Sequence, residues 1–137
     1  MKAKFLVTLA VIGAHSVPVL AHHSFAAEFD ADSPIELTGT VTKVEWMNPH
    51  TFFYIDVEKE NGEHENWALE LGSPNGLMRR GWTRNSLQVG NVVSVTGSRA
   101  RDGSLLKGNA RSIVLSNGIR LFNGTNQVDP DLVELPQ

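Results

Sequence analysis

Short runs with apolar residues at alternate positions constrain the fold of this chain more than any other feature. Each run ends where Gly, Pro, Asn or Asp residues gather. A period of two predicts β-strands that bury one face, and Gly39 stands where the first strand would bend. The pattern predicts strands over residues 35–46, 51–58, 64–71, 92–97, 110–115 and 119–122.

The segment from Ser73 to Gly81 carries the signals of a short helix instead. Ser73 is a capping residue, Pro74 suits the first helical position, and Gly81 is typical of a helix end. Three strands, a short helix and at least two further strands match the order of an OB-type barrel. We predict an all-β fold, a small OB-like antiparallel barrel of five to six strands with one short helix. An antiparallel sandwich of the same strands is the alternative.

The first residues have the composition of a secretory signal peptide. Lys2 and Lys4 precede an apolar run, and the segment ends in a small residue at Ala21. The apolar run is shorter than the roughly 20 residues that a membrane-spanning helix needs. We therefore predict a cleaved signal peptide over residues 1–21, a periplasmic location, no stable membrane anchor, and a mature chain that begins at His22. Cleavage one or two residues away is the alternative.

The rest of the chain is predicted to form one domain with two flanking segments. Residues 22–33 would be an N-terminal arm, residues 34–122 the OB-like barrel, and residues 123–137 a loose C-terminal tail. There is no cysteine, so core packing must stabilise the domain without disulfides. The formal net charge is −3 and becomes more negative when the signal is removed. This charge disfavours polyanionic partners, so we expect no nucleic acid binding.

Three histidines are the candidate metal ligands: His22, His23 and His50. If cleavage precedes His22, its new α-amine and its imidazole can chelate one ion, because both are nitrogen donors. His50 is the candidate third ligand, because Pro49 constrains the turn that carries it to the rim where OB barrels bind ligands. His23 would point away from His22 in an extended arm, which makes it an alternate or auxiliary ligand.

Nitrogen ligands without a thiolate favour Cu(II), with Ni(II) and Zn(II) behind it. Copper is therefore the predicted cofactor. The predicted function is periplasmic carriage or buffering of this metal, with a periplasmic protein as a further partner. His64 lies between Glu63 and Glu65 and is interpreted as a solvated strand residue. A solvated terminus at His22 and a turn-capping role for His50 form the competing interpretation.

Other residue types give weaker indications. Trp46, Trp67 and Trp82 could form a stacking platform, but aromatic residues in a small domain more commonly build the core. Glu45 and Glu70 could form a carboxylate pair, although strand carboxylates normally face solvent. No nucleophile motif favours an enzyme, and copper redox catalysis stays open. The alternative function is a metal-free OB-type module that binds a small molecule, a glycan or a protein.

The chain resembles a family of small exported bacterial proteins of unknown function. The resemblance is carried by the motif HHSF at residues 22–25 and by W-x-NPH at residues 46–50, and it extends over nearly all of the mature chain. It implies a periplasmic setting and supplies no activity. The histidine arrangement also resembles that of periplasmic copper carriers with an N-terminal histidine brace. This second likeness concerns the site and implies nothing about the fold.

Overall fold

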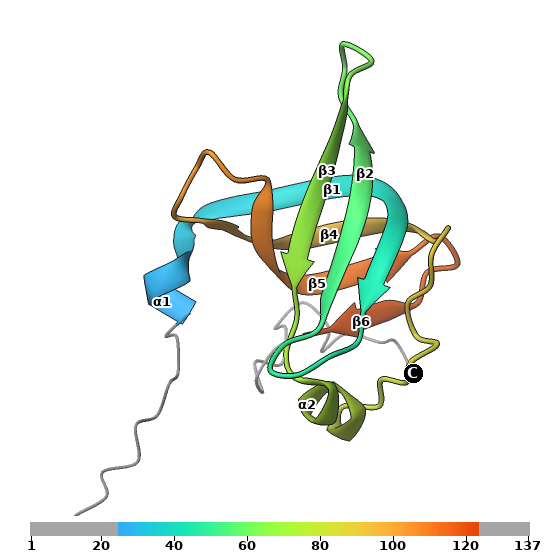
Figure 1. The fold of residues 1–137 in the computed structure, drawn as a ribbon. Helices are drawn as coiled ribbons and strands as arrows, with labels where there is room; N and C mark the ends of the chain where they lie inside the picture. Colours follow the sequence, from blue (N-terminus) through green and yellow to red (C-terminus); the bar gives the residue numbers. More distant parts are fainter. Residues whose placement is uncertain (1–24, 124–137) are drawn as a thin grey trace, which may run out of the picture.

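The computed structural model of the protein describes residues 25–123, which form a barrel of β-strands with two short helices (Figure 1). Every predicted strand and the predicted helix is present, and β1, β4 and β5 are longer than the sequence pattern indicates. The elements in chain order are α1 (Phe25–Glu28), β1 (Phe29–Glu45), β2 (Phe52–Glu58), β3 (His64–Glu70), α2 (Pro74–Arg79), β4 (Val92–Ala100), β5 (Lys107–Leu115) and β6 (Arg120–Phe122).

The strands form one sheet in the order β3-β2-β1-β4-β5-β6, and neighbours in this order run antiparallel. A parallel pairing between residues 68–70 of β3 and residues 107–109 of β5 closes the sheet. We call this pairing the seam. A closed ring of five strands with a helix between the third and fourth is the OB-type arrangement, so the predicted fold class is confirmed. A two-layer sandwich would leave the seam unpaired.

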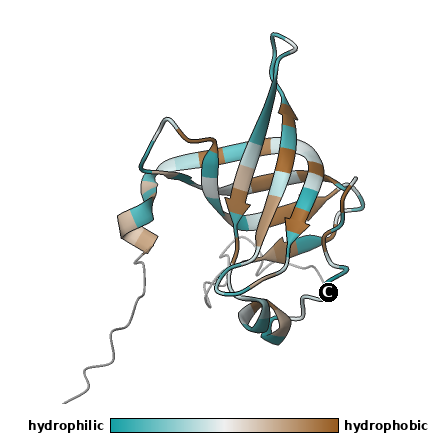
Figure 2. Cartoon of the chain, in the orientation of Figure 1, coloured by the Kyte–Doolittle hydropathy of each residue, from teal (hydrophilic) through white to brown (hydrophobic). Residues whose placement is uncertain are grey.

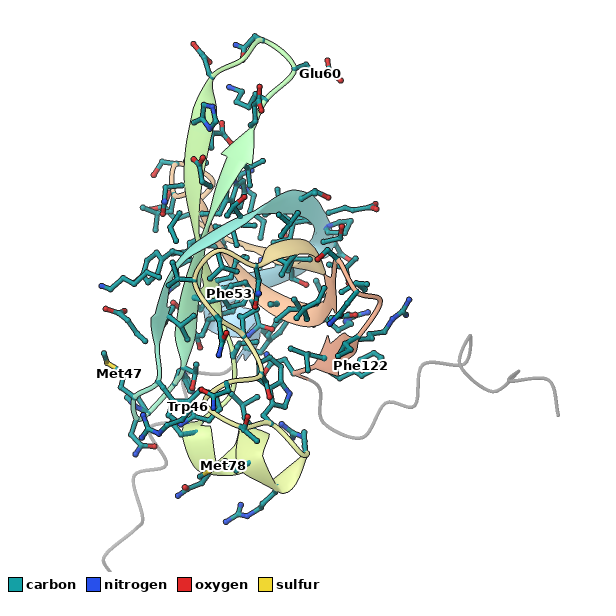
Figure 3. All side chains as sticks on the ribbon, turned by 90° about the vertical axis from the view of Figure 1, so that its right-hand side faces the viewer. Trp46, Met47, Phe53, Glu60, Met78 and Phe122 are labelled. Carbon is teal, nitrogen blue, oxygen red and sulfur yellow. The ribbon has the colours of Figure 1, made fainter. Side chains whose placement is uncertain are left out.

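Apolar residues at alternate strand positions fill the barrel. Phe53, Ile55, Leu69, Val95 and Ile113 are fully buried in one cluster, and Figure 3 shows Phe53 inside the barrel. This is the face that the period of two predicts. The hairpin of β2 and β3 projects beyond the barrel and is hydrophilic at its tip (Figure 2). The tip is polar because no opposite strand covers it there.

Helix α2 covers the end of the barrel next to the loop between β1 and β2 (Figure 1). The Gly76 N–H donates to the Ser73 side-chain oxygen at 3.2 Å, which is the predicted helix cap. Leu77 and Trp82 are buried against the core, and the indole N–H of Trp82 donates to the Phe122 carbonyl at 3.0 Å. Burial of Leu77 and the bond from Trp82, which follows the helix, to β6 therefore hold this segment against the barrel.

Strand β1 begins at Phe29, before the expected start of the barrel at residue 34. Phe29 pairs with Ala100 of β4 and is 2% exposed. A bulge between Asp30 and Pro34 lets the strand pass the proline, which has no N–H for a ladder. The Asp30 carboxylate accepts bonds from the Asp32 N–H at 3.1 Å and the Ser33 hydroxyl at 3.0 Å within the bulge. Residues 25–33 are thus a helical turn and a paired strand, where an arm was expected.

Candidate functional site

His50 stands in the loop between β1 and β2, at the end of the barrel that α2 covers. Two backbone bonds fix the residue that follows it: the Thr51 N–H donates to the Gly72 carbonyl at 3.0 Å, and the Leu71 N–H donates to the Thr51 carbonyl at 2.8 Å. These bonds place the loop beside the end of β3. Figure 3 shows Trp46 and Met47 of the same loop above α2.

The closest polar contact of His50 is with Glu70, the last residue of β3. Nδ1 of His50 lies 2.6 Å from Oε1 of Glu70. The Glu70 side chain is 7% exposed, whereas the His50 side chain is 42% exposed. One ring nitrogen of His50 therefore faces a buried carboxylate, while Nε2, on the opposite side of the ring, is the nitrogen left for a ligand.

Glu70 also faces Lys107, the first residue of β5. The seam sets Ala68 opposite Lys107, so the side chains of Lys107 and Glu70 emerge on the outer side of the barrel together. Nζ of Lys107 lies 3.8 Å from Oε2 of Glu70, and it also pairs with the Glu28 carboxylate of α1. We call Glu28, Lys107, Glu70 and His50 the seam row. Along the row, the charges of Glu28, Lys107 and Glu70 are negative, positive and negative.

Aromatic rings cover the ammonium group of Lys107. Nζ lies 5.6 Å from the ring centroid of Phe29 and 5.5 Å from that of Phe52. A cation over aromatic faces is stabilised by the ring quadrupole. Phe29 lies outside the main core cluster although it is buried. The seam row is therefore a small packed cluster on the outside of the barrel, partly shielded from solvent.

Helix α1 is attached beside the seam row. The Arg101 guanidinium Nε–H donates to the Ala26 carbonyl at 2.7 Å, and the Arg101 backbone N–H donates to the Glu28 carbonyl at 2.9 Å. The rings of Phe25 and Phe29 lie 5.6 Å apart. These contacts hold residues 25–29 against the barrel. The end of α1 at Glu28 therefore lies at Lys107, two side chains from His50 in the row.

The predicted metal ligands have different outcomes. His22 and His23 lie outside the described residues. Within residues 25–123, no group of three or more His, Cys, Asp or Glu side chains could hold a metal ion. His64 lies at the other end of β3 from Glu70, about 20 Å along the strand. Its Nδ1 is 2.8 Å from Oδ2 of Asp56, and its side chain is 54% exposed, as its interpretation as a solvated residue expects.

The proposed carboxylate pair of Glu45 and Glu70 is not formed. Glu45 accepts a bond from the Tyr54 hydroxyl at 2.9 Å and pairs with Lys43, whereas Glu70 faces His50 and Lys107. Glu70 was predicted to face solvent, because strand alternation places its side chain on the other face from Leu69 and Leu71. Glu70 is buried because of the seam, in which β3 pairs with β5. Strand β5 lies far along the chain, and no local sequence pattern predicts that pairing.

The titration of Tyr54 tests the hydrogen bond between its hydroxyl group and Glu45 on the outer face of the barrel. The hydrogen bond to Glu45 and partial burial raise the pKa of the Tyr54 phenol, while the Lys43 and Tyr54 bonds lower the pKa of Glu45. This tyrosine is the only one in the chain. Ultraviolet titration should show phenol ionisation above the ordinary value of about 10, and Glu45→Gln should move it back down. The neutral phenol is favoured in the folded state, so this contribution to stability is lost as pH rises through the raised pKa. An unchanged titration in Glu45→Gln would contradict the contact.

The tryptophans do not form an exposed platform. Trp67 and Trp82 are buried, and Trp46 packs partly buried against the core. The Arg99 guanidinium lies 5.0 Å from the ring centroid of Trp67 and covers it from outside. The core interpretation of these residues is therefore confirmed.

Comparisons with known proteins address the fold and the family. Two solved structures are similar to the barrel. The mitochondrial single-stranded DNA binding protein Rim1 of S. cerevisiae has 15% identity and a TM-score of 0.48, over 67% of this chain and 96% of that one. The N-terminal domain of PriB from Thermoanaerobacter tencongensis has 23% identity and a TM-score of 0.45, over 61% and 96%. A comparison with curated proteins finds no match.

These likenesses correct one expectation about partners. The prediction that excluded nucleic acid is wrong as an exclusion, because one protein of similar fold, Rim1, is named as a single-stranded DNA binding protein. Net charge was too weak a basis for it. At these identities the likeness concerns the fold and assigns no ligand to this chain. Between residues 25 and 123, neither helix is long and apolar enough to cross a lipid bilayer.

The sequence model of one protein family matches most of the chain. Its description is "Family of unknown function (DUF6152)", and it matches residues 10–109. This range includes both the HHSF and the W-x-NPH segments. The resemblance to a family of unknown function is confirmed, while export and the role of the two motifs stay predictions. The chain belongs to the DUF6152 family.

Proposed function

We propose that this protein is an exported metal-binding protein and that copper is its metal. The ligands would be the α-amine and imidazole of His22 together with Nε2 of His50, with His23 as alternate or auxiliary ligand. The observation that carries the proposal is the contact between Nδ1 of His50 and the buried Glu70 carboxylate. The role would be carriage, buffering or delivery of copper in the periplasm.

The Glu70 contact prepares His50 for metal binding in two ways. A histidine that ligates through one ring nitrogen commonly engages a carboxylate with the other, which orients the ring and makes it a better donor. Here Nδ1 faces Glu70, so Nε2 would be the ligating nitrogen. Lys107 in turn pairs with Glu70, which keeps the carboxylate in position when no metal is bound.

The attachment of α1 fixes the start of the described chain beside the seam row. Glu28 pairs with Lys107, Lys107 faces Glu70, and Glu70 contacts His50. His22 precedes Glu28 by six residues. Residues 25–28 are helical, so the reach towards His50 would come from the three residues before α1, which span roughly 10 Å when extended. A site with these nitrogen donors and no thiolate would prefer Cu(II) over Ni(II) or Zn(II).

The test uses the processed protein purified from a bacterial periplasm, with its first residue established by intact mass. Addition of Cu(II) should reveal one tight equivalent with nitrogen ligation in the electron paramagnetic resonance spectrum. His50→Ala should abolish the tight equivalent. Glu70→Gln should weaken it by about 10- to 100-fold, as loss of an outer-shell partner does. His64→Ala is the matched control, because His64 also contacts a carboxylate but lies at the far hairpin.

Three outcomes would count against the proposal. A chain that begins at His22 and shows no saturable copper binding would remove the metal function. Equal effects of His50→Ala and His64→Ala would show that copper binds histidines nonspecifically. Tight binding that survives His50→Ala would place the site elsewhere. The remaining candidate would then be a metal-free binding module on the same barrel.

A further inference from the structure

A cleft lies on the outer surface of β1, β4 and β5 and shares no residue with the seam row. Its volume is about 470 Å³, which falls within the range of small-molecule sites. Aliphatic groups, hydroxyl groups and two charged side chains line it. The lining includes Pro34, Ile35, Glu36, Thr96, Ser98 and Arg111.

Two β-bulges border this cleft. In β1, residues 31–33 are unpaired between the Asp30 and Pro34 positions of the β1–β4 ladder. In β5, Arg111 is the extra residue, because Ala110 pairs with Gly97 and Ser112 pairs with Thr96. A bulge bends its strand and redirects a side chain, and bulges are frequent beside binding sites. The two irregularities lie on either side of β4, so they open the same stretch of surface.

Arg111 and Glu36 are uncommitted charges at the cleft. Within residues 25–123, neither side chain makes a hydrogen bond or an ion pair, and the two do not pair with each other. Most other charged side chains around the barrel have partners, as Arg99 and Arg101 do. Glu36 belongs to β1 and Arg111 to β5, so β4 lies between them. Two strand spacings separate their backbones by about 10 Å.

We propose that the cleft binds a short aliphatic peptide with free termini. Its carboxylate would form a two-pronged contact with the Arg111 guanidinium, for which this side chain is shaped. Its terminal ammonium would face Glu36, and its aliphatic side chains would lie on Ala31 and Pro34. A dipeptide extends about 7 Å along its backbone, so it can bridge two side chains that lean in from β1 and β5. A single amino acid holds its two charges too close together to reach both.

The probe is L-alanyl-L-leucine, added to the ¹⁵N-labelled processed protein and followed by NMR. The expected result is saturable shifts at millimolar peptide in the amides of residues 35, 36 and 96–98. Arg111→Gln should weaken binding at least about tenfold, as loss of a charged bidentate contact does. Glu36→Gln should weaken binding of the free dipeptide but leave that of the N-acetylated dipeptide unchanged. Arg84→Gln removes an arginine outside the cleft and is the matched control.

The proposal is overturned if the wild-type protein shows no saturable shift at these residues. It is also overturned if Arg111→Gln and Arg84→Gln behave alike, or if the N-acetylated dipeptide binds the wild type as well as the free one does. A circular dichroism melt of each variant separates lost binding from lost folding. Arg111→Lys provides a second check, because it keeps the charge and should bind with intermediate affinity. None of these results depends on copper.

Discussion

Replacing Gly97 with alanine should destabilise the barrel by about 3 kcal/mol or more. A Cβ atom at this position would overlap the carbonyl oxygen of Asn109 and crowd the backbone of Ala110. These are backbone atoms of the neighbouring strand, so no side-chain rotation can relieve the overlap. The register of the β4–β5 ladder shifts at Gly97, where the two strands approach closely. The clash would therefore separate two strands of the closed ring.

Urea unfolding followed by tryptophan fluorescence measures this effect. Gly103→Ala is the control, because a Cβ there meets no atom within 4 Å and its backbone needs no special conformation. Its free energy of unfolding should stay within about 0.5 kcal/mol of the wild-type value. Equal stability of Gly97→Ala and the wild type would mean that β4 and β5 do not approach at this bulge.

Lys107→Met should lower the free energy of unfolding by about 2 to 3 kcal/mol. The substitution removes the cation that pairs with Glu28 and faces Glu70, while a methionine can still cover the Phe29 and Phe52 rings. Glu70 would then keep a buried negative charge without its lysine. A buried charge that loses one of its partners costs more free energy than an exposed ion pair contributes, so the destabilisation should exceed that of replacing any surface lysine.

Two companion variants test this reason for the loss. Lys59→Met removes a lysine whose pairs with Glu63 and Glu65 are at the exposed hairpin, and it should cost less than about 0.5 kcal/mol. The double variant of Lys107→Met with Glu70→Leu should regain part of the loss, since it removes the buried carboxylate together with its partner. A single Lys107→Met that unfolds like Lys59→Met would show that the seam row is solvated.

Local patterns were sufficient for β2, β3 and α2. The hairpin strands follow from alternation around the turn that contains Gly62, and α2 follows from Ser73 at its start. Gly39 has a tertiary role, because a Cβ there would overlap the Asp56 carbonyl oxygen of β2, while the irregularity of the β1–β2 ladder lies between Val41 and Lys43. For β2, β3 and α2, residues within a few positions carry the signal, because turn and cap geometry depend on neighbours in sequence.

The candidate site could be predicted only in part. His50 was identified because Pro49 shapes its turn, but Glu70 was interpreted as solvent-facing, and the ion pairs of Lys107 with Glu70 and Glu28 were not foreseen. These residues come from the loop, β3, β5 and α1, and the seam brings them together. Likewise, Arg111 faces the cleft because of a bulge in the β4–β5 ladder. Strand pairing brings these residues together from distant parts of the chain, and a local sequence pattern cannot indicate such partners.

The sequence by itself determined the strand-forming segments, the short helix and the all-β fold class, because periodicity and turn chemistry are local properties of the chain. Only the tertiary structure decided that β1 starts at Phe29, that β3 pairs with β5, and that a strand carboxylate at Glu70 is buried beside His50. The physical reason is that burial of a side chain depends on what the assembled barrel packs beside it. A carboxylate at the same position of the alternation is solvated on an open sheet face and buried next to the seam.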